Sequence, residues 1–154
     1  MKAVLVIACI SVFGIASTTG LRTVPQKLAE IFSITVEQAE LCVNKTKVIL
    51  EDLRAFEDQL GQSYNDKLLE QENTRRAICT LTCAAQAQGT MQGAKLQMPK
   101  IHELIDGVDG MSETTKNQMH QLVDICHTDV TDVTNECEVG LRFITCLITR
   151  GSKK

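Results

Sequence analysis

Apolar residues recur along most of this chain at the three- and four-residue spacing that places them on one face of a helix. In one such segment, Met119, Leu122, Val123 and Cys126 fall on a common face. The chain has no long stretch with the two-residue alternation of a half-buried strand, and it has no Asn-Gly hairpin signal. The pattern therefore predicts an all-α protein with about six helices.

Residues that favour helix ends divide this pattern into segments. Pro25 suits the first position of a helix, Asn73 suits an N-cap, and Gly89 suits the residue that follows a helix end. We expect helices to begin near Pro25, Thr35, Val48, Asn73, Pro99, Ser112 and either Thr131 or Asp132, with a short helix over 67–72 capped by Ser63, and with turns at Gly61, 89–93 and 107–110.

The first twenty residues have the features of a secretory signal peptide. Lys2 supplies a short positive region, Ala3–Ile15 is a mostly apolar run, and small residues follow over 16–20. The run is too short to span a bilayer comfortably, and no second long apolar segment follows it. We therefore predict a signal peptide over 1–20, cleaved after Ala16 or Gly20, and one soluble domain over 21–154, secreted into an extracellular fluid.

Six cysteines remain once Cys9 leaves with the signal peptide. An even number of cysteines in a secreted chain predicts three disulfides, although spacing alone leaves many pairings open. Cys79 and Cys83 lie four residues apart on a predicted helix, so their sulfurs share a face and can reach two different neighbours. Zinc sites usually need compact cysteine and histidine clusters, which this spacing does not supply. We expect disulfides, no metal site and no cofactor.

Charge and motifs exclude several classes of function. The formal net charge is -3 and no basic cluster is present, so nucleic-acid binding has no electrostatic support. Gly61–Asn65 lacks the second glycine of a nucleophile elbow, and His102-Glu103 lacks the second histidine of a metalloprotease motif. We therefore expect no enzyme activity, and we expect His102, His120 and His127 to be solvated helical side chains.

The spacing of the six cysteines carries a resemblance to a known family. It is Cys42-x36-Cys79-x3-Cys83-x42-Cys126-x10-Cys137-x8-Cys146. With the signal peptide, the length of 154 residues and the helical pattern, this spacing resembles that of the insect odorant-binding proteins of the pheromone-binding/general odorant-binding family. The resemblance implies a compact bundle of about six helices around an apolar internal cavity, with disulfides Cys42–Cys83, Cys79–Cys137 and Cys126–Cys146.

The resemblance also implies a function. Family members carry small hydrophobic odorants or pheromones through the aqueous lymph of chemosensory hairs to receptors, and we expect a monomer or weak homodimer here. Two alternatives stay open: a carrier of another hydrophobic ligand outside olfactory tissue, and a secreted helical interaction protein without a cavity.

Candidate cavity residues come from the apolar helix faces. Methionine adapts to ligands of varied shape, although from composition alone the methionines would be expected simply to fill the core. Tyr64, Thr80 and Thr82 are candidate polar contacts. The expected wall residues are Phe56, Ile78, Leu81, Met98, Ile101, Leu104, Met119, Leu122, Val123, Phe143 and Leu147.

Overall fold

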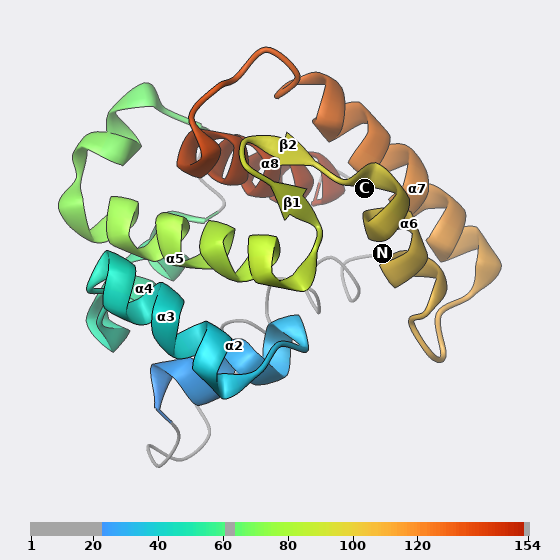
Figure 1. The fold of residues 1–154 in the computed structure, drawn as a ribbon. Coiled ribbons are helices and arrows are strands. Elements are labelled where there is room, and N and C mark those ends of the chain that lie inside the picture. The colour runs from blue at the N-terminus through green and yellow to red at the C-terminus, as the bar shows by residue number, and fades with distance from the viewer. Residues whose placement is uncertain (1–22, 61–63, 153–154) are drawn as a thin grey trace.

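The computed structural model describes residues 23–60 and 64–152. The predicted signal peptide, the turn at Gly61 and the predicted Ser63 cap lie outside the described residues. Within them the prediction of an all-α fold is confirmed (Figure 1). The helices are α2 (Val24–Phe32), α3 (Val36–Thr46), α4 (Leu50–Gln59), α5 (Glu72–Gln88), α6 (Met98–Asp106), α7 (Glu113–Thr128), α8 (Glu136–Gly151) and the 3-10 helix η2 (Asp66–Glu70), and two short strands are β1 (Met91–Gln92) and β2 (Lys95–Leu96).

Most helix ends lie where local chemistry places them. Thr35 forms a capping box at the start of α3, because its hydroxyl accepts from the Gln38 amide and the Gln38 side chain accepts from the Thr35 amide. Ser112 caps α7 through the Thr115 amide at 3.2 Å. Gly89 ends α5 with a φ of 92°, a left-handed conformation that glycine adopts without a Cβ penalty.

Several predicted helix starts differ from the structure, among them that of α4, which begins at Leu50 and not at Val48. Helix α5 begins at Glu72, just before the predicted Asn73 cap. Helix α8 is capped by Asn135, whose side chain accepts from the Glu138 amide at 3.0 Å, so the predicted cap at Thr131 or Asp132 was wrong. The physical reason is that Thr131 and Asp132 lie in the turn that follows α7, where the Thr131 hydroxyl donates to the Thr128 carbonyl at 3.3 Å and so does not cap a following helix.

A small antiparallel hairpin follows α5, in a region predicted only to turn. Met91 pairs with Leu96 and Gln92 pairs with Lys95. Each strand is only two residues long, which is too short to produce a recognisable alternation in the sequence. The buried Met91 packs this hairpin onto the helical core.

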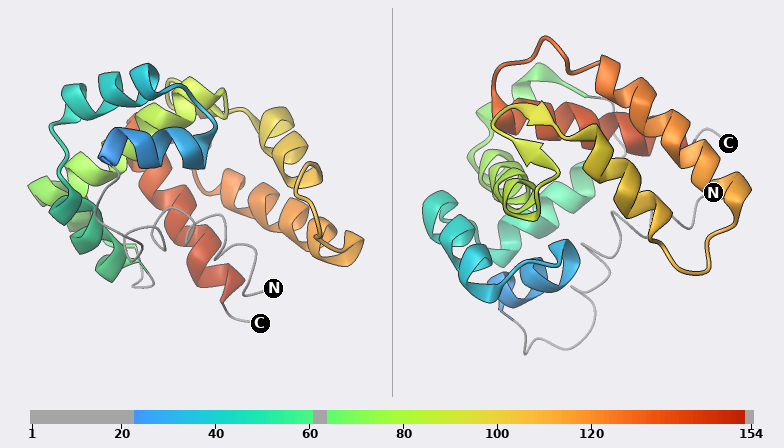
Figure 2. Two further views of the ribbon diagram at one scale, coloured as in Figure 1. Left: turned by 90° about the horizontal axis from the view of Figure 1, so that it is seen from below. Right: turned by 45° about the vertical axis from the view of Figure 1, so that its right-hand side comes forward.

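Helix α5 is the central element of the fold. It contacts α2, α3, α4, η2, β1 and α8, while α8 packs against α7 and α7 against α6. The views in Figures 1 and 2 show α6 and α7 side by side, on the far side of α5 and α8 from α2 and α3. Helices α5 and α8 therefore join an N-terminal group of helices to the α6–α7 pair.

Three disulfides fix this arrangement. Cys42–Cys83 joins α3 to α5, Cys79–Cys137 joins α5 to α8, and Cys126–Cys146 joins α7 to α8, with S–S distances of 2.00, 2.11 and 1.99 Å. We call them the α3–α5, α5–α8 and α7–α8 disulfides. The pairing implied by the family resemblance is confirmed, and Cys79 and Cys83 reach two different helices.

The apolar interior consists of three clusters. The N-terminal cluster is formed by Leu28, Ala29, Ala39, Phe56, Ala77, Ile78, Leu81 and Leu141. The α6–α8 cluster is formed by Ile105, Met119, Val123, Cys126, Cys146 and Leu147, with Met98, Ile101, Met111, Leu122 and Phe143 partly buried against it. The hairpin cluster is formed by Met91, Val130 and Val139.

Candidate ligand-binding site

The α6–α8 cluster brings together most of the predicted wall residues. Their side chains come from three helices, and the α7–α8 disulfide lies within the cluster. Partial burial of several of them leaves apolar surface that is not fully committed to core packing. The predicted wall residues in this cluster are Met98, Ile101, Met119, Leu122, Val123, Phe143 and Leu147.

The remaining predicted wall residues lie elsewhere. Phe56, Ile78 and Leu81 belong to the N-terminal cluster, where Phe56 is only 1% exposed. Leu104 is 40% exposed and belongs to no cluster of the described residues. Phe143 packs against both the α6–α8 and the hairpin clusters. The predicted wall is therefore divided between two groups of helices, and contact of these residues with a ligand stays a prediction.

The three polar candidates have different surroundings. The Thr80 hydroxyl donates to the carbonyl of Arg76 at 2.6 Å and lies 2.5 Å from the Thr46 hydroxyl, so it is engaged within the protein. The Thr82 hydroxyl is the one buried side-chain polar atom of the described residues that lacks a hydrogen-bond partner. An added Cβ at Gly140 would lie less than 3.0 Å from it, which shows how closely α5 and α8 approach there.

Tyr64 lies at the junction of η2 and α8. Its hydroxyl donates to Glu138 at 3.5 Å, and the guanidinium carbon of Arg142 lies 4.7 Å from its ring centre. Burial, together with a hydrogen bond to Asp66, raises the pKa of Tyr64 above its ordinary value. A neutral, hydrogen-bonded phenol can orient a polar group of a ligand but does not supply a base.

A half-open pocket lies beside the hairpin, away from the predicted wall. Its volume is about 190 Å³, and none of the predicted wall residues lines it. The floor includes the buried Val130 of the hairpin cluster. The lining residues are Ala94, Lys95, Leu96, His127, Val130 and Thr131.

A buried ion pair joins α4 to α5. The Asp52 carboxylate is 4% exposed. It accepts hydrogen bonds from Nε and a terminal nitrogen of Arg76, both at 2.8 Å, and from the Ile49 amide at 3.0 Å. The hydrogen bond from Arg76 is the main cause that holds the pKa of Asp52 below its ordinary value. Arg76 also pairs with Glu72, one helical turn before it, on the exposed side.

Two of the three histidines are paired, so the expectation of solvated side chains was wrong for them. His102 on α6 and His120 on α7 lie with their Nδ1 atoms 2.5 Å apart. They are 18 positions apart in the chain, and only the packing of α6 on α7 brings them together. The sequence carried no spacing signal for this contact. His127, by contrast, lines the hairpin pocket.

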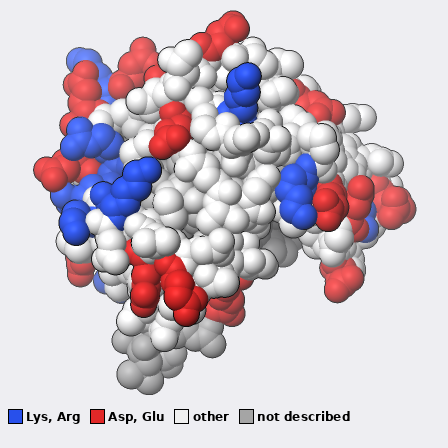
Figure 3. Space-filling view, viewed as in Figure 1, with Lys and Arg blue, Asp and Glu red and all other residues white. Residues whose placement is uncertain are grey.

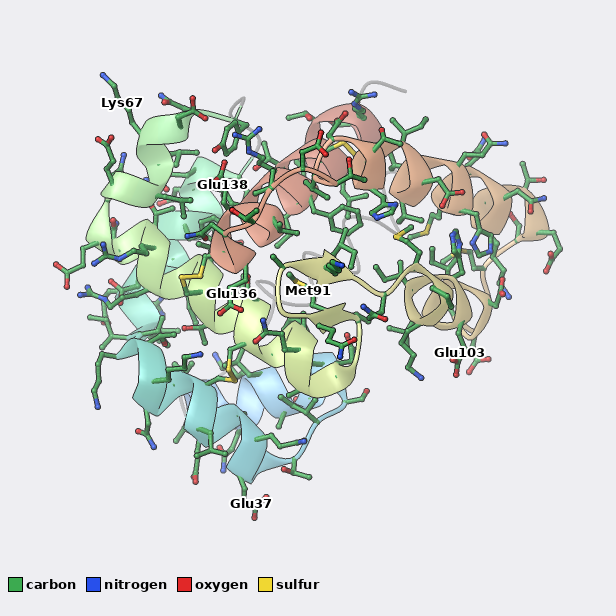
Figure 4. The ribbon with its side chains drawn as sticks, turned by 45° about the horizontal axis from the view of Figure 1, so that its top comes forward. Glu37, Lys67, Met91, Glu103, Glu136 and Glu138 are labelled. Carbon is green, nitrogen blue, oxygen red and sulfur yellow. A yellow bond between two sulfur atoms is a disulfide. The ribbon has the colours of Figure 1, made fainter. Side chains whose placement is uncertain are left out.

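Charged side chains are unevenly distributed over the face shown in Figure 3. In the face shown in Figure 3, Lys, Arg, Asp and Glu lie mainly toward the rim, and the middle of the face is largely uncharged. Glu136 links α8 to α5 by accepting from Gln86 at 2.8 Å, and Figure 4 shows it at the meeting of these helices. No helix in the described ranges is long and apolar enough to cross a membrane.

Comparison with known proteins identifies the family. No curated protein and no solved structure matches the chain. The model of the PBP/GOBP family matches residues 28–150, which include every helix from α3 to α7 and most of α2 and α8. All three disulfides lie within the match. On this match, the chain belongs to the PBP/GOBP family, the insect odorant- and pheromone-binding proteins.

Proposed function

We propose that this protein is a secreted carrier that binds a small hydrophobic odorant or pheromone and transports it through aqueous lymph to chemosensory receptors. The observation that carries the proposal is the family match over residues 28–150. The family is one of binding proteins rather than enzymes, which is consistent with the absence of a nucleophile motif from the sequence.

The α6–α8 cluster is the proposed binding region. Met98, Met111 and Met119 contribute flexible side chains to it, and methionine adapts to ligands of different shape. Burial of a ligand against this surface stabilises the complex by about 25 cal/mol per Å² of apolar area removed from water. The α7–α8 disulfide holds two walls of the region together, whereas α6 carries no disulfide and is not tied covalently to either.

The test is uptake of a fluorescent apolar probe by delipidated, correctly oxidised protein, followed by displacement with small odorants. Phe143→Ala removes a partly buried ring that contacts two clusters, so probe affinity should fall about tenfold, equivalent to about 1.4 kcal/mol. Leu41→Ala is the control, because this side chain is 70% exposed on α3 and is not one of the predicted wall residues, and it should leave affinity unchanged. If no apolar probe is taken up by the folded protein, the carrier function is rejected.

A further inference from the structure

The contact between α6 and α7 contains a symmetrical arrangement of two histidines and two aspartates. His102 Nε2 lies 2.8 Å from an Asp124 oxygen, and His120 Nε2 lies 2.8 Å from an Asp106 oxygen. The two remaining ring nitrogens, both Nδ1, point at each other at 2.5 Å. Each histidine therefore contacts a carboxylate of the neighbouring helix through Nε2, and its Nδ1 faces the Nδ1 of the other histidine.

The carboxylates determine the tautomers of the rings. A carboxylate accepts hydrogen bonds, so each Nε2 must carry the proton that it donates. A neutral imidazole protonated at Nε2 has a lone pair on Nδ1, and two such lone pairs facing each other repel. A cation between the Nδ1 atoms, either a shared proton or a metal ion, removes this repulsion.

The same arrangement is the one found around metal-binding histidines. Such residues usually bind the ion through one ring nitrogen while the other donates to a carboxylate, which fixes the tautomer and raises the basicity of the ligand. Here both histidines have this partner. Imidazole nitrogen is a preferred ligand of Zn²⁺ and Cu²⁺ and a poor one of Mg²⁺ and Ca²⁺.

We propose that His102 and His120 bind one divalent transition metal ion of the Zn²⁺ and Cu²⁺ type through their Nδ1 atoms, linking α6 to α7. Tetrahedral Zn²⁺ with bonds of about 2.1 Å needs roughly 3.4 Å between two ligand nitrogens, so the rings must part by about 0.9 Å from the observed 2.5 Å. Within the described residues no group of three or more side chains could hold a metal ion, so an ion bound by these two histidines would take its remaining ligands from water. The side chains are 29% and 23% exposed, which gives the ion and its water access.

The proposed site has a structural consequence for the fold. Helix α6 is the one wall of the α6–α8 cluster without a disulfide, so a metal link between His102 and His120 would fasten it to α7. The site does not depend on the proposed carrier function, because it rests only on the contact between the two helices.

The test is titration of untagged, oxidised protein with Zn²⁺ by calorimetry at a fixed neutral pH, with Cu²⁺ and Mg²⁺ in parallel. We expect one saturable Zn²⁺ site, tighter binding of Cu²⁺, no binding of Mg²⁺, and a rise in Tm with Zn²⁺. His102→Gln and His120→Gln should each weaken binding of Zn²⁺ at least tenfold. His127→Gln is the matched control, because this third histidine lies on α7 outside the pair, and it should bind Zn²⁺ like the parent protein.

A further variant tests the proposal even if the histidine variants fail to fold. Asp124→Asn keeps both histidines and changes only the carboxylate behind His102, so it should fold and bind Zn²⁺ about tenfold more weakly. Absence of saturable Zn²⁺ binding would overturn the proposal in favour of a shared proton. Equal Zn²⁺ affinity in the His102→Gln and His127→Gln variants would overturn it as well, by placing the ion elsewhere.

Discussion

Helices α5 and α8 pack tightly at Gly140 and Thr82, so the effect of substituting Gly140 on stability should depend on the side chain at position 82. Gly140 of α8 lies where an added Cβ would be less than 3.0 Å from the Thr82 hydroxyl of α5, while the next nearest atoms, on Ile78 and Thr82, lie at 3.6 and 3.7 Å. A single oxygen therefore accounts for the conflict. Thr82 is β-branched and is limited to two rotamers within a helix, so its hydroxyl has few positions to which it can move.

The magnitude follows from two opposing effects. Overpacking a well-packed interior costs about 1–3 kcal/mol, whereas alanine is favoured over glycine within a helix by about 1 kcal/mol. Gly140→Ala should therefore destabilise the protein by about 1 kcal/mol. In a Thr82→Ala background the conflicting oxygen is absent, so the same substitution should instead stabilise by up to about 1 kcal/mol.

The assay is equilibrium unfolding in urea with the disulfides intact, comparing midpoints at constant m. Gly107→Ala is the matched control: its Cβ would meet only backbone oxygens at 3.5 and 3.7 Å, so it should be near neutral in both backgrounds. If Gly140→Ala changes the unfolding free energy equally in the parent protein and in the Thr82→Ala background, the packing argument is refuted. Stabilisation in the parent background would refute it too.

Other features of the structure lead to predictions that equilibrium unfolding in urea can also test. Asp52→Asn should lower the unfolding free energy by about 1–3 kcal/mol, since it weakens charge-assisted hydrogen bonds of a buried carboxylate. Glu72→Gln, on the exposed side of the same Arg76, should change the unfolding free energy by less than about 0.5 kcal/mol. Equal effects of the two substitutions would contradict the assignment of the main interaction to Asp52. Because the pKa of Asp52 is lowered in the folded state, its contribution is full above the ordinary value of 3.8 and is lost as pH falls through the folded pKa, so the difference between parent and Asp52→Asn should narrow below pH 3.8. Replacing both cysteines of the α5–α8 disulfide by alanine should cost about 4.2 kcal/mol and those of the α7–α8 disulfide about 3.3 kcal/mol, because the closed loops span 58 and 20 residues; the reverse order would contradict the loop-entropy reasoning.

Local features of the fold could be predicted from the sequence. The Thr35 and Ser112 caps and the end of α5 at Gly89 depend on neighbouring residues alone, so their chemistry is visible in the chain. The start of α8 was missed because Thr131, Asp132 and Asn135 are all suitable N-cap residues, and the sequence does not show that the turn after α7 takes up the first two. The spacing of the cysteines resembled that of a family whose known pairing supplied the disulfides.

The candidate site could be predicted only in part. Helical periodicity identifies the apolar face of each helix but not which faces meet, so Phe56 and Met119 were assigned to one wall and lie in different clusters. Leu104 has helical spacing like its neighbours yet is exposed on α6. The pair of His102 and His120 depends on the crossing of two helices, which no sequence spacing specifies.

The central claim is that the folded protein holds one small apolar molecule. The most direct measurement is a native mass spectrum of the delipidated, oxidised protein after incubation with a volatile apolar ligand of odorant size. The proposal predicts a new species heavier by the mass of a single ligand molecule. At a ligand concentration that half-saturates the parent protein, the fraction of this species should fall when Phe143 is replaced by alanine. A spectrum that contains only the ligand-free mass at saturating ligand, from protein with all three disulfides formed, would contradict the carrier function.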